Sequence, residues 1–277
     1  MDKIAFLRKK AIEIRMELLR MICRAKSGHL GGSLSCADIL VCLYYHVMKL
    51  DPRRPDWPDR DRFILSKGHS VEGYYAILAD CGFFPSAELD TYGCFGTRLA
   101  GHPCVKVPGI EMNTGALGHG LSVGVGMALA GRMDGRDYRV FVLMGDGEQA
   151  EGSVWEAAMA AGHYRLGNLI GIIDRNKLQI SGFTENVMAL EPLKAKWTSF
   201  GWNVAEADGH DMAELAEVFS AVALKKDRPG LIIAHTVKGK GLSFAENEAR
   251  WHHGIPDEEQ LAAGMEDLRR QLREACP

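Results

Sequence analysis

The stretch Tyr138–Tyr164 decides the fold: it consists of YRVFVLM, then GDGEQAEG (Gly145–Gly152), then a serine and VWEAAMAAGHY. The apolar run before the first glycine is typical of a buried strand, and the run after the last has helical spacing. An ordinary turn between a strand and a helix does not need three acidic side chains in eight residues. We therefore interpret this stretch as a strand–loop–helix unit with a ligand at its loop.

Strands and helices alternate along the chain, which predicts an α/β fold: a parallel twisted sheet with helices on both faces. We expect residues 1–277 to form a single domain with N- and C-terminal extensions. Loops are predicted at Ser27–Ser35 and at Phe83–Gly109, which is long enough to be functional. The predicted strands are Arg62–Ser66, Tyr138–Met144, Leu169–Asp174, Trp202–Ala207 and Leu231–Thr236. The predicted helices are Phe6–Ala25, Cys36–Met48, Ser70–Gly82, Leu121–Met133, Ser153–Tyr164, Pro192–Phe200, Met212–Ala223 and Asp257–Glu274.

The composition of the 277 residues limits the function classes. The chain is 47% hydrophobic and 25% charged with a net charge of −3, so we expect a soluble globular protein without nucleic acid or membrane as a partner. No apolar run reaches the roughly 18 residues of a membrane span, and the N-terminus lacks the apolar core of a signal peptide. The seven cysteines form no C-x-x-C pair, which favours reduced thiols and a cytoplasmic location.

Two oxygen-bearing side chains are expected at one edge of this sheet. Asp146 follows one predicted strand and Asn176 follows the next, 30 residues later. A strand–helix–strand unit of that length makes the two strands parallel neighbours, so both side chains reach the edge where such sheets bind ligands. Oxygen ligands without His or Cys suit Mg²⁺ or Ca²⁺, and Mg²⁺ recruits phosphate oxygens. Because Gly145 and Gly147 let main-chain N–H groups approach a phosphate, we predict a metal-bridged diphosphate cradle.

The segment GDGEQAEGSVWEAAMAAGHYRLGNLIGIIDRNKLQISG (Gly145–Gly182) resembles the thiamine diphosphate signature, which is GDG followed by Asn after about 30 residues. GDG alone also fits a tight turn, but the spacing and flanking elements match as well. From SGHLGGSLS (Ser27–Ser35) to WHHG (Trp251–Gly254), the chain resembles the N-terminal, cofactor-binding portion of transketolase. The resemblance implies the diphosphate-binding half of the thiamine diphosphate-binding fold, with thiamine diphosphate and Mg²⁺ (or Ca²⁺) as cofactors.

The resemblance also implies roles for individual residues. The side chains of Asp146 and Asn176 and the main-chain oxygen of Leu178 would bind the metal. Gly147 would lie against the diphosphate, and Ile180 against the cofactor rings. The whole predicted cofactor-binding set is His69, Gly115, Ala116, Leu117, Gly145, Asp146, Gly147, Glu148, Glu151, Asn176, Ile180, Lys238 and His253.

Further stretches that match the family carry several of these residues. They are SGH (Ser27–His29), DRFILSKGHS (Asp61–Ser70), GHP (Gly101–Pro103) and the pair TVKGKG and WHHG, which carries Lys238 and His253. PGIEMNTGALGHGLS (Pro108–Ser122) is similar to the thiazole-binding loop, with Ala116 where the family has proline. Glu148 could equally be a solvated or capping carboxylate.

Histidines form the second half of the predicted site, and the predicted catalytic residues are His29, His69, His102 and His253. Imidazole donates and accepts protons near neutral pH, which suits a reaction that moves protons on and off sugar hydroxyls. A single loop histidine is more often a surface residue, but the first three each lie beside glycine in a matching motif. The roles of His119 and His252 stay open, and structural roles are expected for His46, His163, His210 and His235.

The resemblance implies transketolase activity, the transfer of a two-carbon ketol unit from a ketose (phosphate) to an aldose (phosphate). In transketolases the glutamate that activates the coenzyme belongs to a second domain, and this chain ends at Pro277. We therefore expect the N-terminal subunit of a split enzyme, active only with a separate C-terminal subunit in a two-plus-two heterotetramer. Glu151 is similar to the family's interface glutamate. Two alternatives stay open: a related enzyme such as deoxyxylulose phosphate synthase, and a non-catalytic module that binds cofactor or a partner.

Overall fold

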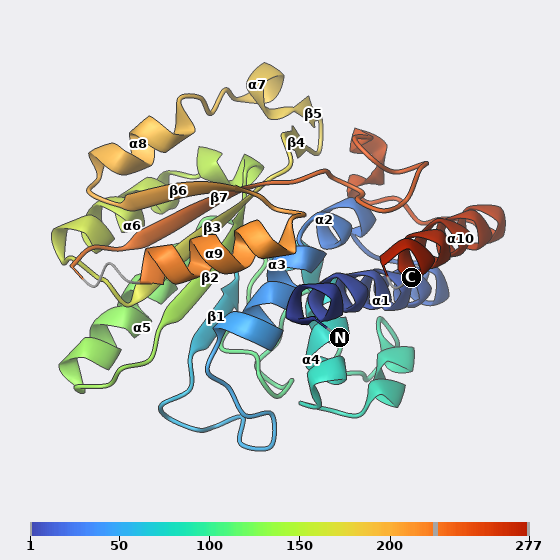
Figure 1. Ribbon diagram of the computed structural model, residues 1–277, viewed down its shortest axis with the longest axis horizontal. Helices are drawn as coiled ribbons and strands as arrows, with labels where there is room; N and C mark the ends of the chain where they lie inside the picture. The colour runs from blue at the N-terminus through green and yellow to red at the C-terminus, as the bar shows by residue number, and fades with distance from the viewer. Residues whose placement is uncertain (1, 224–226, 276–277) are drawn as a thin grey trace.

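The centre of the computed structural model is a five-stranded sheet, and the structure describes residues 2–223 and 227–275 (Figure 1). All four strand pairings are parallel, which confirms the predicted α/β class. Each strand begins and ends within two residues of its prediction. In spatial order the strands are β1 (Arg62–Leu65), β2 (Val140–Gly145), β3 (Leu169–Arg175), β7 (Gly230–His235) and β6 (Asn203–Asp208).

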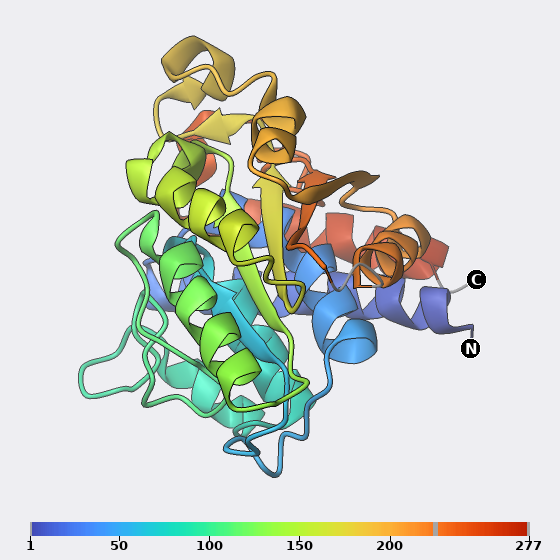
Figure 2. The same ribbon diagram turned by 90° about the vertical axis from the view of Figure 1, so that its left-hand side faces the viewer.

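Both faces of the sheet are buried. On β2, Phe141 and Leu143 join the core on one face, whereas Val142 and Met144 join the core on the other. Strands buried on both faces have this continuous apolar pattern, because successive side chains point in opposite directions. The first core includes α1 (Lys3–Ala25), α3 (Ala37–Cys42), α4 (Val71–Cys81) and α9 (Met212–Ala223). The second includes α5 (His119–Met133), α6 (Gly152–His163) and α8 (Leu193–Ser199), and Figure 2 shows α5 and α6 side by side.

Shorter elements complete the chain, and some were not predicted. The predicted loop Ser27–Ser35 contains the helix α2 (Leu30–Ser35). Its sequence LGGSLS has poor helix propensity, but all six residues are buried, so tertiary packing overrides the propensity. The predicted helix Cys36–Met48 is α3 followed by a π-helical turn, Leu43–Val47. The other elements are 3₁₀ turns at Gly68–Ser70, Ser86–Thr91, Gly147–Ala150 and Ala249–His252, the hairpin β4 (Leu178–Gln179) and β5 (Gly182–Phe183), α7 (Thr184–Val187) and α10 (Glu258–Ala275), which packs on α1.

The cysteines within residues 2–223 and 227–275 are all free thiols. Cys36 and Cys42 are buried, Cys94 is exposed, and Cys276 lies outside the described residues. No helix in this part of the chain has the length and apolar character that a membrane span requires.

Candidate functional site

The carboxyl ends of β2 and β3 lie side by side, because the strand register pairs Gly145 with Asp174. Asp146 and Asn176 follow these ends, and both side chains are buried. The main-chain N–H of Lys177, the residue after Asn176, donates a hydrogen bond of 2.5 Å to Asp146 Oδ2. The predicted meeting of the two segments at one edge of the sheet is therefore confirmed.

The surroundings of Asp146 favour a bound cation. Its Oδ1 accepts a hydrogen bond of 2.8 Å from the Gly147 N–H, and Arg175 Nη1 lies 3.3 Å from Oδ2. Burial, followed by the charge of nearby Asp174, raises the pKa of Asp146 to about 6. A buried carboxylate with a raised pKa is a group whose charge a cation would stabilise. The position therefore fits a metal ligand.

The other two predicted metal ligands also supply oxygen atoms. Asn176 Oδ1 accepts a hydrogen bond of 3.1 Å from the Leu178 N–H, and the Leu178 carbonyl accepts one of 3.2 Å from Lys238 Nζ. Carboxylate, amide and carbonyl oxygens are the donors that Mg²⁺ and Ca²⁺ prefer. Within residues 2–223 and 227–275, no three His, Cys, Asp or Glu side chains are grouped to hold a metal. Of the three predicted ligands, Asp146 alone belongs to one of these four residue types, so this finding does not test the predicted set. The three metal ligands therefore stay a prediction.

A buried ion pair lies beneath this edge of the sheet. Lys67 and Asp174 are 2% and 0% exposed, and the Lys67 ammonium contacts the Asp174 carboxylate. Burial opposes both charges, but their attraction outweighs it, so the pKa of Asp174 is lowered and that of Lys67 is raised. Lys67 Nζ also donates to the Gly32 carbonyl at 3.0 Å, and Asp174 accepts from Ser35 Oγ at 2.5 Å. The pair thus joins α2 to the ends of β1 and β3.

Asp174 was not among the predicted site residues, although an acidic residue at the end of the apolar run LIGIID is a signal that could have found it. Its carboxylate accepts a hydrogen bond of 3.3 Å from Asn176 Nδ2. Because the amide nitrogen of Asn176 points toward Asp174, its Oδ1 points away from the ion pair. Asp174 therefore fixes the orientation of a predicted metal ligand.

Five histidines gather beside the strand ends. The ring centre of His29 lies 4.6 Å from that of His253, 5.3 Å from His69, 5.6 Å from His252 and 6.1 Å from His102. The rings of His69 and His252 are 5.1 Å apart. The structure thus brings together the four predicted catalytic histidines, which come from segments far apart in the sequence. It adds His252, whose role the sequence left open.

Burial and nearby charges favour neutral imidazoles at His29, His69 and His252. Burial, helped by nearby lysines and histidines, lowers the pKa of His29 to about 4 and that of His252 to about 3, and holds the pKa of His69 well below its usual range. Burial and Lys67 lower the pKa of Lys238 to about 8. Lys238 Nζ lies 2.9 Å from His252 Nδ1. A site lined with buried ammonium groups and imidazoles suits an anionic ligand with hydroxyl groups, and thus fits a diphosphate and a sugar.

The predicted thiazole-binding loop packs directly on the histidine segments. A Cβ atom at Gly68 would lie 2.5 Å from Thr114 Oγ1 and 2.8 Å from the Gly115 nitrogen. Gly115 has φ +137°, and a Cβ there would lie 2.8 Å from His102 Cδ2. The loop can approach His69 and His102 this closely because neither glycine has a side chain.

Glu148 connects this loop to the end of β2. Its buried carboxylate accepts hydrogen bonds of 2.8 Å from the Gly118 N–H and 3.0 Å from the Gly145 N–H, and it also bonds the Ser66 hydroxyl. Burial raises its pKa, while these hydrogen bonds oppose the rise. These hydrogen bonds join the loop to the segments at the ends of β1 and β2, so Glu148 helps to shape the site. Direct cofactor contact stays a prediction.

Other predicted residues lie at the rim. Ile180 is 73% exposed at the turn of the β4–β5 hairpin, and Ala116 and Glu151 are also exposed. Leu117 is half-buried. A cavity of about 610 Å³, lined in part by Asn176 and Thr236, opens beside the ends of β3 and β7. Of the predicted site residues, Asn176 lines this cavity, and neither Asp146 nor the clustered histidines do.

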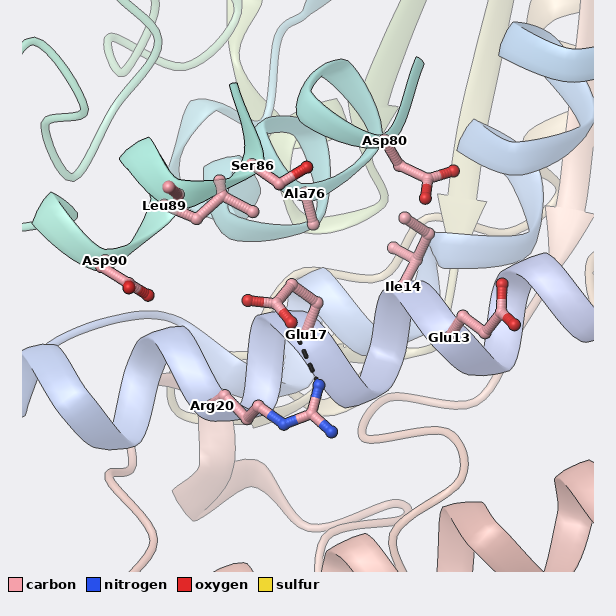
Figure 3. Close-up of a pocket in the computed structure, with 10 residues that line it drawn as sticks. Glu13, Ile14, Glu17, Arg20, Ala76, Asp80, Ser86, Leu89 and Asp90 are labelled. Carbon is pink, nitrogen blue, oxygen red and sulfur yellow. Dashed lines mark hydrogen bonds and ion pairs between the residues drawn. The ribbon is translucent and has the colours of Figure 1, made fainter. Parts of the chain in front are cut away.

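A separate groove of about 470 Å³ lies between α1 and the segment that begins with α4 (Figure 3). Its acidic side chains have basic partners: Glu17 bonds Arg20 at 3.1 Å, and Asp80 bonds Lys10 at 3.0 Å. None of the predicted site residues lines it. Its lining is Glu13, Ile14, Glu17, Arg20, Ala76, Asp80, Ser86, Ala87, Leu89 and Asp90.

The fold and the site together define a class of protein. A parallel sheet with oxygen donors at two neighbouring strand ends, faced by buried lysines and by half-buried or exposed histidines, is a cofactor-binding α/β domain suited to a phosphate-bearing ligand. Residues 7–272 match the family described as transketolase, thiamine diphosphate binding domain. The chain belongs to this family.

Curated relatives cover nearly the whole chain. It is 51% identical over 258 residues to an apulose-4-phosphate transketolase subunit of Phocaeicola vulgatus, covering 93% of this chain and 92% of the relative. It is 43% identical over 266 residues to the 6-deoxy-6-sulfo-D-fructose transketolase subunit SqwG of a Clostridium species, covering 96% and 97%. These relatives are subunits of about the same length as this chain.

Solved transketolases have the same fold. The Campylobacter jejuni enzyme superposes with a TM-score of 0.90 at 29% identity, covering 99% of this chain and 46% of that one. The Leishmania mexicana enzyme gives a TM-score of 0.88 at 31% identity, covering 97% and 44%. This chain therefore spans less than half the length of these transketolases. The likeness confirms the predicted thiamine diphosphate-binding fold.

Proposed function

We propose that this chain is the cofactor-binding subunit of a two-subunit transketolase, which transfers a two-carbon ketol unit from a ketose phosphate to an aldose phosphate. The observation that carries the proposal is the cluster of five histidines beside the strand-end oxygens. Such a cluster suits a substrate with several hydroxyls whose protons move during the reaction. The near full-length match to two subunits of named transketolases supports it.

The acidic side of the site, which consists of Asp146, Asn176 and the Leu178 carbonyl, would hold the cofactor. Thiamine diphosphate, when bound, supplies the carbon nucleophile that allows a C–C bond next to a carbonyl to break. Asp146, Asn176 and the Leu178 carbonyl would hold Mg²⁺ (or Ca²⁺), which would offset the negative charge of the diphosphate. His69 and Lys238 would donate hydrogen bonds to the diphosphate. The metal would serve to anchor the cofactor.

The histidine side would act on the sugar. His29, with its pKa lowered to about 4, is neutral at pH 7, so one ring nitrogen can accept a hydrogen bond from a hydroxyl and the other can donate one to a developing alkoxide. His102 and His253 flank it and would orient neighbouring hydroxyls. Imidazole N–H groups aimed at developing negative charge stabilise a transition state.

The partner would be a separate C-terminal subunit, and we propose a two-plus-two heterotetramer in the cytoplasm. Two relatives are named as one subunit of an apulose-4-phosphate transketolase, which supports a second chain, and free thiols among the described cysteines fit a reducing compartment. Glu151, exposed at the start of α6, would face this partner. For substrates, the names of the relatives suggest branched or sulfonated ketoses beside the pentose phosphates.

The test is reconstitution. The chain is mixed with a candidate C-terminal transketolase subunit, Mg²⁺ and thiamine diphosphate, and ketol transfer is measured with apulose 4-phosphate, 6-deoxy-6-sulfo-D-fructose and pentose phosphates as donors. Two-carbon transfer from any of these donors, which requires both chains, supports the proposal. Condensation of pyruvate with loss of CO₂ would indicate a deoxyxylulose phosphate synthase. Cofactor binding without turnover of any donor would indicate a non-catalytic module.

A further inference from the structure

Glu72 is a buried carboxylate for which the proposed chemistry has no use. It lies in the first turn of α4 and is 0% exposed. Its Oε1 accepts hydrogen bonds of 3.0 Å from the His29 main-chain N–H and 2.7 Å from the Tyr92 hydroxyl. Its Oε2 accepts one of 2.7 Å from the Ser33 hydroxyl.

The three donors come from three segments that surround the histidine cluster. His29 belongs to the loop before α2, Ser33 to α2 itself, and Tyr92 to the long loop that continues to His102. The carboxylate also lies against the main chain at Gly28, where an added Cβ would be 2.6 Å from Glu72 Oε1. Since Gly28 has φ +149°, this position combines a backbone conformation and a contact that suit glycine.

The hydrogen bonds that Glu72 accepts all come from neutral groups. Burial raises its pKa, and the bonds to Ser33 and Tyr92 oppose that rise. Burying a carboxyl group costs free energy that an apolar side chain of the same size would not. What the carboxyl group supplies in return is two acceptor atoms that hold three donors in fixed places.

We propose that Glu72 is a positioning residue: by holding the main chain at His29, it aims the His29 imidazole into the middle of the histidine cluster. His29 is the ring that lies within about 6 Å of all four other histidines, so a shift of this loop would disturb every one of these contacts. The expected effect of Glu72 on catalysis rests on the proposed function. The placement of His29 can be tested without any substrate.

The first arm of the test uses NMR of ¹³C-histidine-labelled chain without its partner. Glu72→Gln keeps the Oε1 acceptor for His29 and Tyr92, and its amide can donate to the Ser33 hydroxyl oxygen, so we expect the His29 ring signals to stay in place. Glu72→Leu removes all three hydrogen bonds, and we expect those signals to shift while those of exposed His163 do not. A His29 signal that stays in place in Glu72→Leu overturns the inference.

A matched pair of tyrosines covers the case in which Glu72→Leu does not fold. Tyr92→Phe deletes a buried hydroxyl that bonds Glu72, and we expect the His29 signals to shift. Tyr74→Phe deletes a buried hydroxyl from α4 that bonds the Gly109 carbonyl at 2.9 Å, and we expect the His29 signals not to shift. Equal effects of the two variants on His29 contradict the positioning role.

The second arm measures kinetics with the complementary subunit. We expect Glu72→Leu to lower kcat by about 10–100-fold, the range for residues that orient others, with a smaller change in cofactor affinity, and Glu72→Gln to restore most of kcat. If Glu72→Gln is as slow as Glu72→Leu while its His29 signals are in place, the charge matters and the positioning role is wrong. If the wild-type pair shows no transfer, the proposed function fails, and the NMR arm still decides the inference.

Discussion

The two sides of the candidate site are built in different ways. The acidic side uses residues that follow neighbouring strands, so sheet register alone places Asp146 next to the segment of Asn176. The histidine side gathers imidazoles from loops and 3₁₀ turns at residues 27–29, 68–70, 101–103 and 249–253. The 68–70 turn directly follows β1, whereas no strand register holds the other three segments. They depend on buried polar groups and on close glycine contacts.

The Lys67–Asp174 ion pair lies beneath both sides. We therefore expect its loss to have the largest effect on the free energy of unfolding. Lys67→Met should lower the free energy of unfolding by about 3–5 kcal/mol, because it leaves the Asp174 carboxylate buried without its partner. Urea unfolding of the isolated chain measures this loss. The control is Lys194→Met, which breaks an exposed pair with Glu206 and should cost less than about 1 kcal/mol. Equal losses in the two variants would show that the buried pair does not support the site.

The next test separates the two sides by their dependence on metal. Asp146→Ala should weaken thiamine diphosphate binding by about 100-fold or more and remove its dependence on Mg²⁺, because the carboxylate ligand is lost. His69→Gln should weaken binding by about 10-fold and keep the Mg²⁺ dependence, because one hydrogen bond to the diphosphate is lost. Calorimetric titrations with and without Mg²⁺ measure both. Mg²⁺-dependent binding that persists in Asp146→Ala would place the metal elsewhere.

Two glycines provide a smaller contrast in stability. Gly68→Ala should lower the free energy of unfolding by about 1–3 kcal/mol, because its Cβ would meet main-chain atoms of the predicted thiazole-binding loop. Gly145→Ala should change stability by less than about 1 kcal/mol, because its Cβ would find Lys67 Cβ at an ordinary 3.8 Å. Urea unfolding checks both variants. A larger cost at Gly145 would mean that the acidic side is the more tightly packed one.

The smallest expected effect is on the pH dependence of stability. The pKa of His252 is about 3 in the folded chain and near 6.5 when unfolded, so below pH 6.5 the unfolded state binds more protons. The wild-type chain should therefore lose stability as pH falls from 6.5 toward 4, and His252→Gln should lose less. Unfolding midpoints from pH 7.5 to 4.5 measure this, with exposed His163→Gln as a control that follows the wild type. Parallel curves for wild type and His252→Gln would contradict the burial of this imidazole.

The sequence predicted that the segments of Asp146 and Asn176 meet at one edge of the sheet, for a physical reason. An apolar run followed by Gly145 and Asp146 marks a strand end, and parallel neighbours must finish at the same edge. The histidines were predicted by resemblance, because no local rule says that loops 33 or more residues apart will converge. Buried polar groups such as Asp174 and Glu72 were not predicted, because their partners are set by tertiary packing. The same holds for α2, which forms where helix propensity is poor.

The central claim is that Asp146, Asn176 and the Leu178 carbonyl hold one divalent ion that tethers the diphosphate. Anomalous diffraction from crystals of the chain with its complementary subunit, thiamine diphosphate and Mn²⁺ tests it most directly. We expect one metal peak within about 2.0–2.6 Å of the Asp146, Asn176 and Leu178 oxygens, with Lys238 no longer bonded to the Leu178 carbonyl. A bound cofactor whose metal peak lies away from Asp146 and Asn176 would contradict it.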